Sequence, residues 1–111
     1  MTLFEIDQFM PHPIETVFAL TVDLAKAPHW HSFFTKIEQL TPNPISKDSQ
    51  WKMHFRGGEF TLEITAYQPP HRVVFRGSQV SKMVPNFTIE MQPVPKGTQI
   101  HYGLHPDIPG W

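Results

Sequence analysis

The chain has 111 residues, a length at which one domain with a single hydrophobic core is expected. Apolar residues make up 40% of it and charged residues 17%, which is typical of globular proteins and not of disordered chains. The net charge of −1 offers no positive surplus for nucleic acid, and the lack of cysteine excludes disulfides and thiolate-bound metals. We therefore expect one domain over residues 1–111 without a nucleic-acid partner.

The N-terminal sequence contains no basic segment followed by the apolar run of a secretory signal. No stretch approaches the roughly 20 apolar residues of a membrane-spanning helix. The expected location is the cytoplasm, without a membrane span.

The first part of the chain changes its hydrophobic period at a pair of prolines. Residues 3–10 alternate loosely and predict a strand that Pro11 and Pro13 end. Residues 13–20 then carry apolar side chains at helical spacing, which predicts a short helix. Asp23 is expected to cap a second short helical stretch that continues to Ala27.

A hairpin in the middle of the chain is predicted with its register. The pair Gly57-Gly58 is typical of a two-residue turn, which would place Arg56 opposite Glu59. One face is then apolar and the other pairs opposite charges. The expected pairs are Phe55 with Phe60, Met53 with Leu62, Trp51 with Ile64, His54 with Thr61, and Lys52 with Glu63.

The rest of the chain also predicts antiparallel strands. Residues 37–40 form a short strand, and residues 87–91 and 100–104 alternate on either side of a turn at Lys96-Gly97. The turn at residues 68–71 places Tyr67 opposite Arg72, Ile64 opposite Phe75 and Glu63 opposite Arg76. The expected fold class is α+β, with a curved antiparallel sheet of about six to seven strands and two short helices between the first two strands.

Three segments carry a resemblance to a known superfamily. They are PHPIETVFALTVDLAKAPHW at residues 11–30, QPPHRVVF at residues 68–75 and PKGT at residues 95–98. They resemble the START-like (SRPBCC) helix-grip superfamily, which includes polyketide cyclases and dehydratases, plant-allergen-like carriers and lipid-transfer domains. The resemblance implies a seven-stranded curved sheet that grips a long C-terminal helix around a ligand cavity.

The sequence departs from that pattern at its C-terminal end. After His105 only six residues follow, and two of them are prolines, which do not fit a long helix. We therefore expect the grip helix to be absent. The apolar face would then form an open groove or be covered by a second copy of the chain.

The inward-facing apolar side chains have two interpretations. Each one alone is most simply a core residue, whereas a partly uncovered set is typical of a ligand or partner surface. Tyr102, with Trp30 or His54, would supply polar orientation. The residues predicted to bind the ligand are Trp30, Phe34, Trp51, Met53, Phe55, Phe60, Leu62, Phe75, Phe87, Ile89 and Tyr102.

Neither a metal site nor a catalytic set is predicted. His29 and His31 flank Trp30, but two ligands are fewer than a zinc site needs, and His101 and His105 fall on the charged outer face. No motif of a nucleophile or a phosphate loop occurs. We expect no cofactor and assign no catalytic residue.

The sequence favours a binder of a hydrophobic small molecule that is lipid-, polyketide- or isoprenoid-like. Two alternatives remain open. One is a cyclase- or dehydratase-like enzyme, which requires at least two convergent polar side chains in the cavity. The other is a dimerisation module without a ligand, because a homodimer through the apolar face would also cover it.

Overall fold

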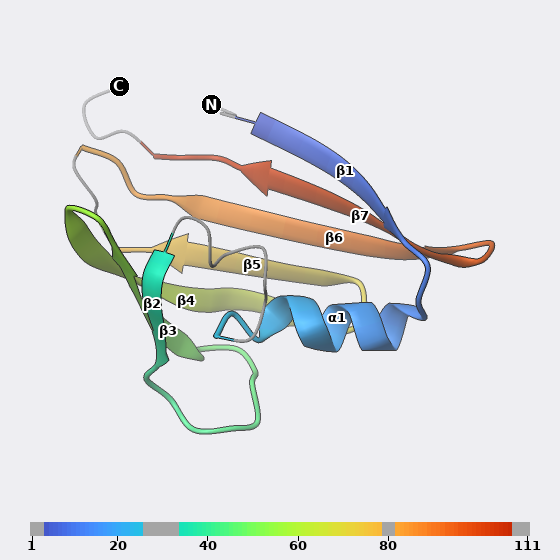
Figure 1. Cartoon of the computed structure of the whole chain (residues 1–111), viewed down its shortest axis with the longest axis horizontal. Coiled ribbons are helices and arrows are strands. Elements are labelled where there is room, and N and C mark those ends of the chain that lie inside the picture. The colour runs from blue at the N-terminus through green and yellow to red at the C-terminus, as the bar shows by residue number, and fades with distance from the viewer. Residues whose placement is uncertain (1–3, 26–33, 79–81, 108–111) are drawn as a thin grey trace.

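The computed structural model describes residues 4–25, 34–78 and 82–107, which form one curved antiparallel sheet and one helix (Figure 1). The strand order across the sheet is β1-β7-β6-β5-β4-β3-β2, so β1 and β2 form its two edges. The expected α+β class and the seven strands are confirmed. The elements in chain order are β1 (Phe4–Met10), α1 (Ile14–Val22), β2 (Phe34–Gln39), β3 (Gln50–Phe55), β4 (Gly58–Gln68), β5 (Arg72–Gly77), β6 (Asn86–Val94) and β7 (Gly97–Leu104).

The sheet has one apolar face, which is concave and holds the core. Because successive side chains in a strand point to opposite faces, the alternating apolar residues of β3 to β7 gather on this side. Trp51 and Phe75 are fully buried there, with ring centroids 5.8 Å apart in an edge-to-face arrangement. The fully buried members of this core are Trp51, Met53, Leu62, Ile64, Val73, Phe75, Ile89 and Ile100, with Leu24 from the chain after α1.

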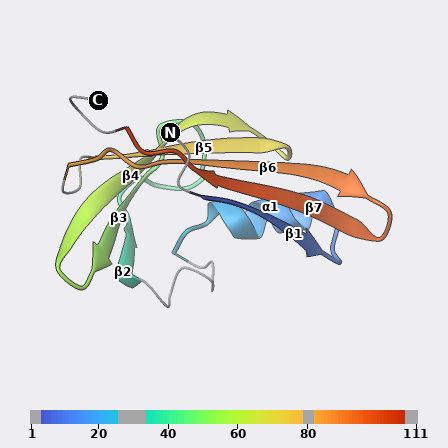
Figure 2. The same cartoon turned by 90° about the horizontal axis from the view of Figure 1, so that it is seen from above.

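Helix α1 lies against part of the concave face (Figures 1 and 2). Pro13 directly precedes its first residue, and the fixed φ of proline suits the start of a helix. Glu15 lies in the first turn, near the positive end of the helix dipole. The buried side of the helix packs on β6 and β7 and brings Phe18 to 5.7 Å from Tyr67, measured between ring centroids. Leu20, on the other side, is 57% exposed. Because the helix packs mainly on β6 and β7, it covers the sheet only in part.

The register predicted for the β3–β4 hairpin is wrong by two residues. Phe55 pairs with Gly58, Met53 with Phe60 and Trp51 with Leu62, so the turn consists of Arg56 and Gly57. Only Gly57 has a positive φ, 114°, and Gly58 continues the strand. The outer face also favours this register, because His54 and Lys52 both lie within ion-pair distance of Glu59, at 3.3 and 3.6 Å. A shift of two residues preserves the faces, so the prediction that Met53 and Leu62 share one face is confirmed.

A β-bulge in β4 changes the predicted pairing with β5. Ile64 lies opposite Phe75 and Glu63 opposite Arg76, as predicted. The register then shifts between Ile64 and Ala66, and Tyr67 pairs with Val73 instead of Arg72. The extra residue restores Tyr67 to the concave face, where it packs on the core.

The remaining expectations about the elements have mixed outcomes. The first strand and the first helix are confirmed, and the strand expected at residues 37–40 is the longer β2. Asp23 directly follows α1, but residues 23–25 form a turn and no helix, so the second short helix is wrong for the described part of that stretch. Residues 26 and 27, the rest of the stretch expected up to Ala27, lie outside the described residues. From Leu104 to Asp107 the described chain forms no helix after β7. In the described part of the chain, α1 is too short to span a membrane.

The hairpin register can be tested with the two glycines of the turn. Gly57→Ala is expected to lower the free energy of unfolding by about 1–2 kcal/mol, because alanine is disfavoured at a positive φ. Gly58→Ala is expected to cost less, since the added methyl group would meet only the tip of the Phe55 ring at 3.3 Å. Urea denaturation of both variants measures the difference. A larger loss in Gly58→Ala would support the register with Gly57-Gly58 at the centre.

Candidate functional site

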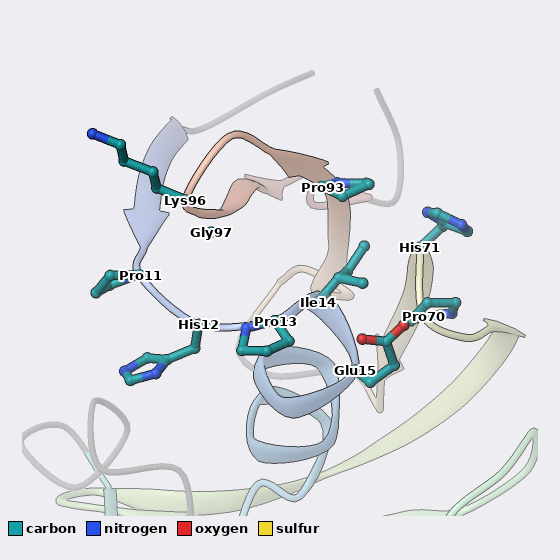
Figure 3. A pocket seen from close by; sticks show the side chains of 10 residues that line it. All are labelled: Pro11, His12, Pro13, Ile14, Glu15, Pro70, His71, Pro93, Lys96 and Gly97. Atoms are coloured by element: carbon teal, nitrogen blue, oxygen red, sulfur yellow. The ribbon is translucent and has the colours of Figure 1, made fainter.

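One recess lies beside the N-terminus of α1 and has a volume of about 710 Å³ (Figure 3). We call it the proline recess. Figure 3 shows the side chains of His12, His71 and Lys96 at its rim, pointing away from its centre. Its lining residues are Pro11, His12, Pro13, Ile14, Glu15, Pro70, His71, Pro93, Lys96 and Gly97, none of which was predicted as a ligand contact.

A smaller hollow lies on the concave face between the β3–β4 turn and the end of β7. It has a volume of about 210 Å³, and its walls expose only apolar surface. The ring of Phe60 lies 5.9 Å from that of Phe34 and 6.0 Å from that of Phe55, both in tilted arrangements. We call it the apolar hollow; it is lined by Phe34, Phe55, Phe60, Met83, Pro85, Phe87 and Leu104. The apolar hollow, unlike the proline recess, is suited to an apolar molecule.

The wall formed by Met83 and Pro85 depends on a close approach to the sheet at Gly77. A Cβ atom at Gly77 would lie 2.5 Å from the Pro85 ring, so a side chain there would displace this wall. The Gly77 backbone N–H donates a hydrogen bond of 2.7 Å to the Pro85 carbonyl. Glycine at this position therefore allows the segment to close over the sheet beside Phe60.

A polar cluster outside the hollow holds the same wall in place. Val84 and Asp107 exchange two backbone hydrogen bonds of 2.8 Å. The carboxylate of Asp107 accepts hydrogen bonds from Arg76 at 2.7 Å and from Asn86 at 3.2 Å. These partners, the Arg76 guanidinium first, lower the pKa of the Asp107 carboxyl below its usual value. The cluster therefore ties the wall both to β5 and to the chain that follows β7.

The structure divides the predicted ligand-binding residues into two groups. Four of them, Phe34, Phe55, Phe60 and Phe87, line the apolar hollow. Trp51, Met53, Leu62, Phe75 and Ile89 are buried in the core instead, with no more than 1% of their surface exposed. Trp30 lies outside the described residues. Met83 and Pro85 were missed because no alternating pattern marks their segment, and Leu104, at the end of the strand expected over residues 100–104, was not among the predicted ligand contacts.

Of the polar groups expected to orient a ligand, Tyr102 and His54 do not line the hollow. Tyr102 is half-buried on the concave face, and burial raises the pKa of its phenol. His54 lies on the outer face, where its ring is 2.6 Å from a Glu38 carboxylate oxygen and 3.3 Å from Glu59. The proposal that His54 orients a ligand in the concave face is therefore wrong. Its hydrogen bond is the main cause of the lowered pKa of Glu38.

Histidines of the outer face take part in pairing between strands. His101 on β7 lies between two acidic residues of the edge strand β1, with Nδ1 2.8 Å from Asp7 and Nε2 3.5 Å from Glu5. The hydrogen bond with Asp7 is the main cause of a raised pKa of the His101 imidazole. The described residues contain no group of three or more potential metal ligands. His29 and His31 lie outside them, so their predicted lack of metal stays a prediction.

The sequence of the whole chain matches a known family. Residues 1–111 match the family described as polyketide cyclase / dehydrase and lipid transport. The chain belongs to this family. The resemblance drawn from the sequence is thereby confirmed, and no curated protein matches the chain.

Solved structures share the fold with low sequence identity. A protein of Deinococcus radiodurans, DR_A0006, is 22% identical with a TM-score of 0.69, over 95% of this chain and 82% of its own. Ara h 8.0201 is 19% identical with a TM-score of 0.75, over 99% and 78%. CalU16 of Micromonospora echinospora is 15% identical with a TM-score of 0.66, over 96% and 60%. At these identities the likeness supports the fold of this family and not a particular ligand.

The pairing of His101 with β1 predicts a pH effect. The imidazole pKa is expected above the ordinary value of about 6.5, and Asp7→Asn should lower it more than Glu5→Gln. Because the pKa is raised in the folded state, the stabilisation is present below about pH 6.5 and is lost as the pH rises through the folded pKa. An NMR titration of the histidines measures both shifts. A larger effect of Glu5→Gln would contradict the assignment of Asp7 as the main partner.

Proposed function

We propose that this protein binds a hydrophobic small molecule, lipid-, polyketide- or isoprenoid-like, with its apolar part in the apolar hollow. The observation that carries the proposal is the lining: four phenylalanine rings surround a space that no polar group of the described residues enters. Apolar pockets with few polar groups are typical ligand sites. The family description, which includes lipid transport, supports the same class of function.

The incomplete cover of the concave face supports binding rather than a closed core. Ile6 of β1 pairs with Tyr102 of the concave face and is 51% exposed. Burying a large apolar side chain contributes roughly 1.5–3 kcal/mol, so a ligand that reaches this surface would gain stability from it. The competing proposal is that a second copy of the chain covers this face. The cytoplasmic location expected from the sequence stays a prediction.

Acid–base chemistry in the apolar hollow has less support. Catalysis of cyclisation or dehydration needs polar side chains that converge on the substrate. Among the described residues that line the hollow, none is titratable. We therefore favour binding over an enzymatic role.

The proposal is tested by filling the apolar hollow. Leu104→Trp places a larger side chain in it and is expected to weaken the binding of an uncharged hydrophobic dye, such as Nile red, by about tenfold or more, equivalent to about 1.4 kcal/mol. Leu40→Trp is the matched control, since Leu40 is 47% exposed and does not line the hollow. Dye fluorescence gives the affinities.

Analytical ultracentrifugation of the same samples gives the number of subunits. A wild-type dimer that binds no dye would contradict the proposal and favour the dimerisation module. Equal dye binding by Leu104→Trp and Leu40→Trp would place the ligand elsewhere. Thermal unfolding of each variant checks that it is folded.

A further inference from the structure

Two positively charged side chains flank the apolar hollow without a partner among the described residues. Arg56 directly follows the lining residue Phe55 in the β3–β4 turn, and Lys82 directly precedes Met83. Both are exposed, and neither forms an ion pair or hydrogen bond with any residue that the structure describes. Figures 1 and 2 place the β3–β4 turn and the chain before β6 at the same end of the sheet.

Two acidic side chains on the segments beside this rim already have partners. Glu59, across the hairpin, is paired with Lys52 at 3.6 Å and with His54 at 3.3 Å on the outer face. Asp107, behind the opposite wall, is paired with Arg76 at 2.7 Å. The charges of both carboxylates are therefore compensated, and the two cations leave this rim with a positive surplus.

We propose that the ligand of the apolar hollow is a single-chain anionic amphiphile, whose apolar chain lies among the phenylalanine rings and whose carboxylate binds between Arg56 and Lys82. This proposal rests on the function proposed above. The arginine guanidinium suits a carboxylate because it can donate two parallel hydrogen bonds, and lysine adds a mobile positive charge. The apolar walls offer no polar atom to the carboxylate, so its position at the rim follows from the cost of burying an unpaired charge.

The size of the hollow limits the length of the buried chain. Its 210 Å³ corresponds to about seven groups of the volume of a water molecule, about 30 Å³ each, and a methylene group is of similar size. An eight-carbon chain is therefore a suitable probe. Octanoate is ionised at pH 7, whereas 1-octanol has the same chain without the charge.

The test compares octanoate with 1-octanol by NMR titration of the wild-type protein and two double variants. The double variant Arg56→Gln with Lys82→Gln is expected to weaken octanoate binding about fivefold at low salt, because it removes two exposed ion pairs with the carboxylate. The affinity for 1-octanol, which carries no charge, is expected to stay unchanged. Lys47→Gln with Lys96→Gln removes the same net charge away from the apolar hollow and is expected to change neither affinity. Added salt should reduce the effect, because it screens exposed charges.

The outcomes separate this proposal from the one that it rests on. If neither probe binds the wild-type protein, the binding function itself is contradicted. If 1-octanol binds and the Arg56 and Lys82 substitutions leave octanoate affinity unchanged, the hollow binds apolar chains and the anionic class is wrong. Loss of octanoate binding in the Lys47 and Lys96 variant would also overturn it, since the carboxylate would then bind elsewhere.

Discussion

The structure depends on one constraint: a sheet with a continuous apolar face has only a nine-residue helix to cover it in the described chain. The curvature of the sheet and α1 together bury the middle of that face, where Trp51, Phe75 and Ile89 have almost no contact with water. Toward the β3–β4 turn the cover ends. The phenylalanines near this turn line the apolar hollow instead of a closed core. The degree of cover therefore distinguishes the buried aromatic residues of the core from those proposed to bind a ligand.

Most of the fold could be predicted because alternation in the strands is a strong signal. The side on which Trp51, Met53 and Leu62 lie follows from period two alone, whatever the exact pairing. The pairing itself was less well determined. Two consecutive glycines allow two positions for the turn, and the bulge before Ala66 leaves no mark in the local sequence that distinguishes it from a regular strand.

The candidate site was predictable only in part, for a different physical reason. Sequence alternation tells which face a side chain occupies but not how much of that face another element covers. Phe60 and Phe75 therefore looked equivalent, although one lines the hollow and the other lies in the core. The wall at Pro85 depends on a long-range approach to Gly77, and no pattern of nearby residues reveals such a contact.

The two-residue shift in the hairpin has a consequence for how the site could change during evolution. A displacement of β3 against β4 by two residues keeps every apolar side chain on the concave side, so the face pattern alone does not distinguish the two registers. The outer-face pairs with Glu59 and the positive φ of Gly57 select one of them. Substitutions at those few exposed positions would remove this selection and allow β3 and β4 to pair two residues further along. Phe60 would then move relative to Phe34, and the shape of the binding surface would be altered by substitutions that never touch it.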